Sequence, residues 1–197
     1  MIPAVVLAGG ASRRMGGGVK PMLHLGGVPM IERVVSRLQS QTPQIAINAN
    51  DGDFSQFHYP VIKDSIAGRP GPLAGVLSAM DWAKSEGADL VVTVAGDTPF
   101  FPKTLVYDLK MGLDDAPIAL AATQKSGRPF AQSVFGIWKT DLADDLRASV
   151  VSGTRKVLDF TQPLDAALVV FEDDSDSFFN VNTPEDLIKA EQRLGAS

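Results

Sequence analysis

The residues best suited to chemistry lie in a glycine- and arginine-rich segment close to the start of the chain. It opens with Gly9-Gly10, contains Arg13 and Arg14, and ends at Lys20. Glycine has no Cβ, so backbone N–H groups can approach a polyphosphate closely, and the cations would add fixed positive charge. The segment is neither a P-loop, since Pro21 follows the lysine, nor a dinucleotide fingerprint. A solvated turn is the alternative, and the three cations in one loop favour phosphate binding over it.

A carboxylate that could hold a metal follows the apolar run Leu90–Ala95. Asp97 comes directly after Gly96, where the chain can turn at the end of a predicted strand. Mg²⁺ prefers one or two carboxylates, several waters and substrate phosphates. The alternative is an aspartate that caps the next turn, because Asp before Thr-Pro often opens turns. Combined with the phosphate-binding segment, the pattern favours Mg²⁺ at Asp97.

Two amides near the C-terminus alternate along an extended segment. Asn180 and Asn182 point to the same side of such a segment because its side chains have a period of two. A helix follows at once, with Thr183 as its N-cap, Pro184 in its first turn and Asp186 completing a capping-box pattern. Asn182 can be explained as part of that cap, whereas Asn180 lies too far from it.

For two further segments, the residues alone do not decide between a functional and a purely structural interpretation. Gly68–Gly75 is a stiff entry to a helix whose N-terminus could face a nucleotide, or a plain connection to a packed helix. Arg155 and Lys156 open a helical pattern and could meet a second anionic substrate. An exposed basic helix face is the alternative for that pair.

Short apolar, β-branched runs alternate with helical patterns along the whole chain. The predicted strands are Ala4–Ala8, Ile45–Asn48, Val61–Lys63, Leu90–Ala95, Ile118–Thr123, Gln132–Gly136 and Leu168–Glu172. The predicted helices are Met30–Gln41, Leu73–Ser85, Lys103–Leu113, Leu142–Ala148, Thr154–Phe160 and Pro184–Arg193. Several strands are apolar on both faces, which is typical of strands covered by helices on each side. The pattern predicts an α/β fold of three αβα layers, Rossmann-like, with a mostly parallel sheet.

Open parallel sheets bind ligands beyond the carboxyl ends of their strands. The positions that follow the predicted strands hold glycines, amides and carboxylates: Gly9-Gly10, Asn48-Ala49-Asn50, Asp64 and Gly96-Asp97. Folding alone does not require this accumulation. We therefore expect the functional site along this edge.

Composition limits the remaining possibilities. The 197 residues, 45% hydrophobic and 21% charged, fit one domain spanning 1–197. A net charge of −5 disfavours non-specific nucleic-acid binding. No cysteine is present, which excludes disulfides and thiolate chemistry, and the presence of only two histidines disfavours a His-rich zinc site. No apolar stretch approaches the roughly 18 residues of a membrane span. We expect a cytoplasmic protein that binds neither nucleic acid nor membrane.

Taken together, these motifs resemble a known family. Leu7–Gly10 with Ser12, Arg14–Gly16 and Lys20 is similar to the signature loop of nucleotidyltransferases that use a nucleoside triphosphate. The segments Gly71–Gly75, Gly96–Pro99 and Asn180–Pro184 narrow the resemblance to the molybdenum cofactor guanylyltransferase (MobA) family. The resemblance runs from Val5 to Leu187 in the family's order. One departure is Val19, where the family usually has an aspartate.

The resemblance implies a nucleotide-diphospho-sugar transferase type of fold and transfer of GMP from GTP to the phosphate of molybdenum-molybdopterin. The products would be the guanine dinucleotide cofactor and pyrophosphate, with Mg²⁺ required. It implies the following roles by position: nucleotide contacts at Leu7, Ala8, Gly9, Gly10, Lys20, Asn48, Asp64 and Asp97; catalysis by Lys20, Arg14 and Asp97; the metal at Asp97; and the second substrate at Arg155, Asn180 and Asn182. Transient contact with molybdoenzyme apoproteins or their chaperones is a further implied partnership.

Three other functions fit the same motifs. A cytidylyltransferase acting on the same pterin would differ only in the base it selects. A sugar-phosphate nucleotidyltransferase is another alternative, although 197 residues leave little room for the extra domain that many such enzymes carry. A non-catalytic carrier would bind GTP and release no pyrophosphate.

Overall fold

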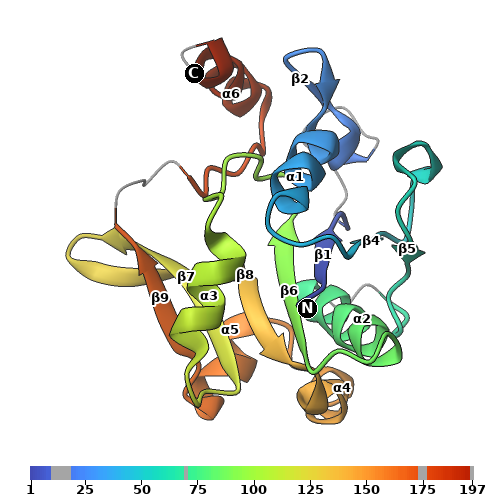
Figure 1. The fold of residues 1–197 in the computed structure, drawn as a ribbon, viewed down its shortest axis with the longest axis vertical. Coiled ribbons are helices and arrows are strands. Elements are labelled where there is room, and N and C mark those ends of the chain that lie inside the picture. Colours follow the sequence, from blue (N-terminus) through green and yellow to red (C-terminus); the bar gives the residue numbers. More distant parts are fainter. Residues whose placement is uncertain (10–18, 69–70, 173–176, 196–197) are drawn as a thin grey trace.

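A seven-stranded sheet in the order β5-β4-β1-β6-β8-β7-β9 organises the computed structural model of the chain (Figure 1). The structure describes residues 1–9, 19–68, 71–172 and 177–195. The strands of this sheet are β1 (Ala4–Leu7), β4 (Ile45–Asn48), β5 (Val61–Ile62), β6 (Leu90–Ala95), β7 (Ile118–Lys125), β8 (Arg128–Lys139) and β9 (Ala167–Phe171). Strand β8 runs antiparallel to both of its neighbours, while the other neighbouring pairs are parallel. The predicted mostly parallel α/β sheet is confirmed.

The strand register brings four strand ends level with one another. In β1, Leu7 pairs with Asn48 of β4 on one side and with Ala95 of β6 on the other. Asn48 in turn pairs with Ile62 of β5. The residues that follow these strands therefore lie along one edge of the sheet, where parallel α/β folds bind ligands.

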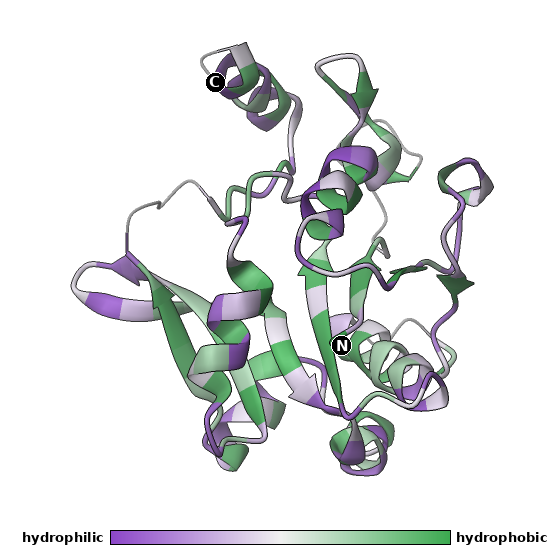
Figure 2. Ribbon diagram, viewed as in Figure 1, coloured by the Kyte–Doolittle hydropathy of each residue, from purple (hydrophilic) through white to green (hydrophobic). Residues whose placement is uncertain are grey.

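Helices cover both faces of the sheet. They are α1 (Met30–Gln39), α2 (Pro72–Ser85), α3 (Leu105–Leu113), α4 (Ala143–Val151), α5 (Val157–Thr161) and α6 (Pro184–Gly195). Helices α1 and α3 pack with Val6 and Ile47 in one core, and α2, α4 and α5 pack with Val5 and Ala46 in another. Neighbouring strand residues thus enter opposite cores, which is why the central strands are mostly hydrophobic (Figure 2).

Helix α6 belongs to a third, smaller core. Ala190 is buried there with Val181, Phe100 and Met30, and with Leu25 of a short hairpin. The hairpin consists of β2 (His24–Leu25) and β3 (Val28–Pro29). This core anchors the segment before α6 beside the ends of the central strands.

The largest differences from the predicted elements occur at hairpins. Strand β8 spans Arg128–Lys139 rather than the predicted Gln132–Gly136, because its exposed first half carries no buried apolar pattern. A tight turn with positive φ at Ser126 and Gly127 joins it to β7. The β2–β3 hairpin was not predicted, since two-residue strands are too short to give a periodic signal.

Two helices also differ from the predicted ranges. Helix α5 starts at Val157 rather than Thr154, because Lys156 has extended backbone angles. Helix α4 runs from Ala143 to Val151 and so ends three residues beyond the predicted Leu142–Ala148, and a 3₁₀ turn occupies the three residues before it. The other boundaries agree within the one or two residues by which helix ends are commonly defined. Within the described ranges, no helix is both long enough and apolar enough to cross a bilayer.

Candidate active site

Four of the predicted site residues meet around the ammonium group of Lys20. Its Nζ lies 2.5 Å from Oδ2 of Asp97, and it donates to the side-chain oxygens of Asn180 at 3.0 Å and Asn182 at 2.5 Å. An ammonium has three donors, so these three oxygens satisfy all of them. The Lys20 and Asp97 side chains are 11% and 21% exposed, so the ion pair is largely shielded from water but still accessible to a ligand.

A close crossing of two segments places Lys20 beside Asp97. Lys20 begins a 3₁₀ turn, and the next residue, Pro21, is buried. A Cβ on Gly96 would lie 3.1 Å from Cγ of Pro21 and 3.3 Å from the carbonyl oxygen of Leu7. The glycine therefore lets the lysine-bearing turn, β1 and the end of β6 approach one another, and Asp97 follows directly.

The two asparagines reach Lys20 because the residue between them faces the other way. Val181 is fully buried, and its N–H donates to the carbonyl oxygen of Asp97 at 3.0 Å. With Val181 held in the small core, the flanking Asn180 and Asn182 both project to the opposite side. The prediction that the two amides point the same way is confirmed by their shared contact with Lys20.

The predicted capping box at the start of α6 is present and also holds Asn182. The carboxylate of Asp186 accepts from the N–H groups of Asn182 and Thr183, both at 3.0 Å, and its own N–H donates to Oγ1 of Thr183. Slight burial raises the pKa of Asp186, but these hydrogen bonds and the charge of Lys189 outweigh it and lower the pKa below its ordinary value. The helix cap thus fixes one of the oxygens around Lys20.

A second polar cluster joins the ends of β4 and β5. Nδ2 of Asn48 donates to Oδ1 of Asp64 at 3.0 Å, and Nδ2 of Asn50 donates to Oδ2 at 2.7 Å. The N–H of Asp64 donates back to Oδ1 of Asn50 at 2.9 Å. The structure thus brings the predicted Asn48 and Asp64 together. Asn50 was noted only as a strand-end amide, although its spacing of two from Asn48 already placed both on one side.

Helix α2 approaches this cluster through Gly75. A Cβ on Gly75 would lie 2.7 Å from Oδ1 of Asn48 and 3.2 Å from Cδ2 of Leu7. The N-cap of α2 is Gly71, whose φ of 92° favours glycine. Gly71 and Gly75 of the predicted helix entry therefore have structural causes, and the start of α2 lies against the same edge of the sheet.

Between the two clusters lies the end of β1. The N–H of Ala8 donates to the carbonyl oxygen of Asn48 at 2.8 Å, and the carbonyl oxygen of Leu7 accepts from Gly96 at 3.0 Å. Gly9 is exposed, and apart from its chain neighbours no atom of the described residues lies within 4 Å of where its Cβ would be. The predicted Gly10 and Arg14 lie outside the described residues.

Arg155 is placed apart from the two asparagines predicted to serve the same substrate. Its Nη1 donates to the carbonyl oxygens of Val150 at 2.7 Å and Thr154 at 2.9 Å. Its backbone oxygen lies near Gly71, at the start of α2. In the described parts of the chain, the contacts of Arg155 are thus with the end of α4 and the entry to α2 and not with Lys20.

Val19, the one departure from the motifs of the resemblance, packs as an apolar residue. Its methyl groups lie 2.7 and 3.4 Å from where a Cβ of Gly52 would be, and it borders the core that contains Phe54. The turn that presents Lys20 is therefore held on this side by hydrophobic contact.

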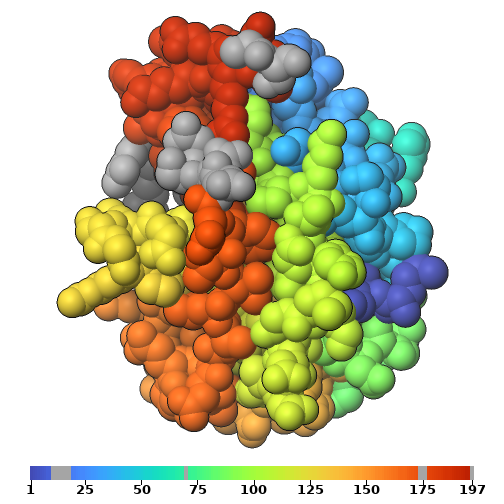
Figure 3. Space-filling model, turned by 60° about the vertical axis from the view of Figure 1, so that its left-hand side comes forward, coloured from blue at the N-terminus to red at the C-terminus, as the bar shows by residue number. Residues whose placement is uncertain are grey.

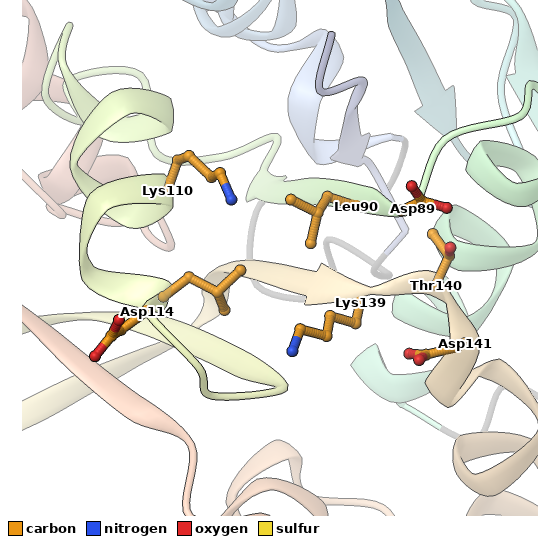
Figure 4. Close-up of a pocket in the computed structure, with 8 residues that line it drawn as sticks. Asp89, Leu90, Lys110, Asp114, Lys139, Thr140 and Asp141 are labelled. Carbon is orange, nitrogen blue, oxygen red and sulfur yellow. The ribbon is translucent and has the colours of Figure 1, made fainter.

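Two hollows lie away from these clusters. One, of about 310 Å³, is lined by Leu90 at the start of β6 and by Lys110 and Lys139, at the opposite edge of the sheet from Asp97 (Figure 4). The other, of about 850 Å³, lies along α3 and β9, which are side by side in Figure 3. Neither hollow is lined by a predicted site residue.

The oxygen atoms around Lys20 fit a hard cation. A carboxylate and two amide oxygens are the ligand types that Mg²⁺ accepts, and Mg²⁺ usually adds waters and substrate phosphates to one or two carboxylates. No group of three or more acidic, histidine or cysteine side chains that could hold a metal occurs in the described ranges. The donor set therefore suits a metal that arrives with a phosphate ligand rather than one held entirely by protein.

The sheet, with a cation and a carboxylate at the ends of its central strands, defines a nucleotide-handling α/β enzyme, and comparison with known proteins identifies the class as nucleotidyltransferases. A family model described as MobA-like NTP transferase domain matches residues 4–167. The chain belongs to this family, whose class generally uses a divalent metal ion.

Curated relatives match along almost the whole chain. The molybdenum cofactor guanylyltransferase of Nitrobacter hamburgensis is 40% identical, over 98% of this chain and 93% of its own. The protein of the same name from Rhizobium meliloti is 44% identical, over 98% and 91% respectively.

Solved structures agree with these relatives. Molybdopterin-guanine dinucleotide biosynthesis protein A from Archaeoglobus fulgidus superposes with a TM-score of 0.77 at 25% identity and covers all of both chains. A putative glucose-1-phosphate thymidylyltransferase from Bacillus anthracis, 15% identical with a TM-score of 0.75 over 98% and 95% of the chains, shares the fold.

Proposed function

We propose that this chain transfers GMP from GTP to the terminal phosphate of molybdenum-molybdopterin. The names of its relatives supply the two substrates. The observation that carries the proposal is the grouping of Lys20, Asp97, Asn180 and Asn182 at the ends of β1 and β6. No serine or cysteine nucleophile is needed, because the acceptor phosphate is itself a nucleophile.

In this reaction an oxygen of the acceptor phosphate forms a bond to the α-phosphorus of GTP. The bond from that phosphorus to the bridging oxygen breaks, and pyrophosphate leaves with the electron pair. The task of the protein is to position two polyanions and to neutralise the charge that develops on the leaving group. Both tasks require cations that are held at a fixed position. The three side-chain oxygens that accept from Nζ of Lys20 support such a position for its ammonium group.

We assign Lys20 to the phosphates of GTP, with Arg14 as a second cation on the leaving group. The backbone at Leu7, Ala8, Gly9 and Gly10 would contact the nucleotide, and Asn48 and Asp64 would hold its other end. When bound, Mg²⁺ would neutralise phosphate charge and fix the phosphate geometry. Asp97 would hold it, with an amide oxygen of Asn180 or Asn182 in reach. Lys20, released from Asp97, would then turn its three donors to the phosphates.

For the second substrate we propose Asn180, Asn182 and Arg155. The guanidinium has five donors, and its hydrogen bonds within the described ranges, to Val150 and Thr154, use Nη1 alone, so Nη2 and Nε are the donors we assign to the phosphate. Contacts with molybdoenzyme apoproteins or their chaperones, a single domain over residues 1–197 and a cytoplasmic location stay predictions of the sequence.

The test is pyrophosphate release by purified protein with Mg²⁺ and molybdenum-molybdopterin, supplied with GTP, CTP, ATP or UTP in turn. Release with GTP alone is expected, and Lys20→Met should reduce it by roughly 10²- to 10³-fold, the loss typical for removal of a charge-stabilising group. Thr183→Ser, which keeps the cap hydroxyl, is the matched control and should retain the wild-type rate. Release with CTP alone would move the assignment to a cytidylyltransferase, and GTP binding without release would favour a carrier.

A further inference from the structure

Three oxygen atoms around Lys20 converge on a single position for a cation. They belong to the side chains of Asp97, Asn180 and Asn182, and they lie 2.5 to 3.0 Å from the ammonium nitrogen. One carboxylate oxygen and two amide oxygens are also ligands of the type that Mg²⁺ accepts. The ammonium group therefore lies at the position that a divalent ion held by Asp97 would need.

Contacts that do not involve the lysine hold these oxygens in place. Buried Thr98 donates from Oγ1 to Oδ1 of Asp97 at 3.2 Å, so Oδ2 is the oxygen that pairs with the ammonium group. The N–H of Asn182 donates to the carboxylate of Asp186 at 3.0 Å. The N–H of Val181 donates to the carbonyl oxygen of Asp97, also at 3.0 Å. We therefore expect the oxygens to keep their places when the ammonium group leaves them.

Lys20 is the member of the group that can move. Its backbone belongs to a 3₁₀ turn in which the next residue, Pro21, is buried. Its ammonium group, in contrast, is carried on a flexible four-carbon stem. Rotation about the bonds of that stem withdraws the charge without disturbing the turn. Phosphate oxygens accept from an ammonium group at least as well as amide oxygens do, so a triphosphate offers the lysine an alternative partner.

A divalent ion and the ammonium group cannot share this position. Like charges a few ångströms apart repel strongly where water is largely excluded, and the Lys20 and Asp97 side chains are 11% and 21% exposed. A metal that binds Asp97 must therefore displace the lysine. No group of three or more acidic, histidine or cysteine side chains in the described ranges could hold the metal instead. With a single carboxylate as ligand, one ammonium group is enough to keep the ion out.

We propose that Lys20 is a built-in counter-ion that excludes divalent cations from Asp97 until the phosphates of a triphosphate take the lysine over. The metal alone does not bind, and the nucleotide prepares its site. The same movement releases the oxygens of Asn180 and Asn182, which the proposed function assigns to the second substrate, so the acceptor follows the nucleotide. This inference rests on the proposed function only in taking the ligand of Lys20 to be a nucleoside triphosphate.

The measurement is Mn²⁺ binding to the nucleotide-free protein, followed by electron paramagnetic resonance of the free ion. Mn²⁺ shares the preference of Mg²⁺ for oxygen ligands. Lys20→Met and Lys20→Gln remove the charge and should bind Mn²⁺ roughly 10- to 100-fold more tightly than the wild type, the range over which groups around a metal ligand commonly change metal affinity. Lys20→Arg keeps the charge and should exclude Mn²⁺ as the wild type does.

A matched control is the ion pair between α2 and α4. Nη2 of Arg147 lies 2.8 Å from each carboxylate oxygen of Asp81. Arg147→Met therefore also deprives a carboxylate of its cation, at a place where no site residue lies. It should leave the Mn²⁺ affinity at the wild-type value. An equal gain of affinity in Arg147→Met would show that any freed carboxylate binds the ion, and would overturn the proposal.

A second measurement, the Kd of GTP by calorimetry in EDTA, tests whether the phosphates alone displace the lysine. The wild type should bind GTP without a divalent ion. Lys20→Met should weaken this binding by roughly 10- to 100-fold, the loss expected for hydrogen bonds to a charged group. Thermal unfolding identifies the variants that fold, and the wild-type arm needs no variant. No GTP binding by the wild type in EDTA, or a folded Lys20→Met protein with the wild-type Mn²⁺ affinity, would refute the exclusion.

The two proposals fail in different ways. If GTP releases pyrophosphate while wild type and Lys20→Met bind Mn²⁺ equally well, the exclusion by Lys20 is wrong and the transferase stands. If the neutral variants gain Mn²⁺ affinity but no triphosphate releases pyrophosphate, the exclusion stands and the transfer reaction is wrong.

Discussion

Substitution of Gly75 by alanine sets a gain in helix propensity against a steric clash. Gly75 lies in the first turns of α2, where alanine would ordinarily stabilise the helix by up to about 1 kcal/mol. Its Cβ would, however, lie 2.7 Å from Oδ1 of Asn48, closer than real Cβ contacts allow. Asn48 is 3% exposed and donates to Asp64 and to the carbonyl oxygen of Ile62. It cannot move without weakening those bonds.

The expected net effect is a loss of stability. Overpacking in a closely packed site costs about 1–3 kcal/mol, so after the helix gain of about 1 kcal/mol we expect Gly75→Ala to lower the free energy of unfolding by about 1 kcal/mol. The measurement is urea unfolding followed by circular dichroism. GTP affinity should fall as well, since the displaced Asn48 no longer orients Asp64.

Two further variants isolate the clash. Gly195→Ala, at the end of α6, should be neutral or slightly stabilising, because outside its own helix backbone and chain neighbours no atom of the described residues lies within 4 Å of the new Cβ. In an Asn48→Ala background the obstructing amide is gone, so Gly75→Ala should then stabilise the protein. If Gly75→Ala stabilises the wild-type protein and leaves GTP affinity unchanged, the reasoning about this contact is refuted.

Three other substitutions have expected outcomes. Thr93→Val should lower the free energy of unfolding by about 1–3 kcal/mol, because buried Thr93 accepts from Nε1 of Trp138 at 2.9 Å; Thr93→Ser should restore most of the stability in the same urea titration. Asp186→Asn should cost about 1 kcal/mol at neutral pH through loss of charged capping. The folded state lowers the pKa of Asp186, so its carboxylate contributes fully to the free energy of unfolding above the ordinary pKa of about 3.9. That contribution is lost as pH falls through the lowered pKa, so the stabilities of wild type and variant should converge in acid. A stability difference that stays constant down to pH 2 would contradict this. Asp97→Ala should abolish Mg²⁺-dependent protection of the GTP complex against thermal unfolding, whereas protection equal to wild type would remove the metal from Asp97.

The sequence predicted the α/β sheet because its central strands are apolar on both faces, a local signal that needs no knowledge of the partner strands. It predicted the capping box of α6 for the same reason, since Thr183 and Asp186 interact within one turn. It missed the β2–β3 hairpin and the first half of β8, whose residues are too few or too exposed to make a pattern.

The amino-acid sequence by itself determined the strand ends and the polar groups of the candidate site: Lys20, Asn48, Asp64, Asp97 and the two C-terminal asparagines. Only the tertiary structure decided which of them meet. Lys20 contacts Asn182 across 162 positions of chain, and Asn50 closes on Asp64 through the pairing of β4 with β5. Such contacts depend on strand order and on the close approach allowed by Gly96 and Gly75. The residues adjacent to a position in the sequence do not determine which distant residues pack against it. Residue spacing therefore identifies the polar groups of the site, and the tertiary structure brings them together.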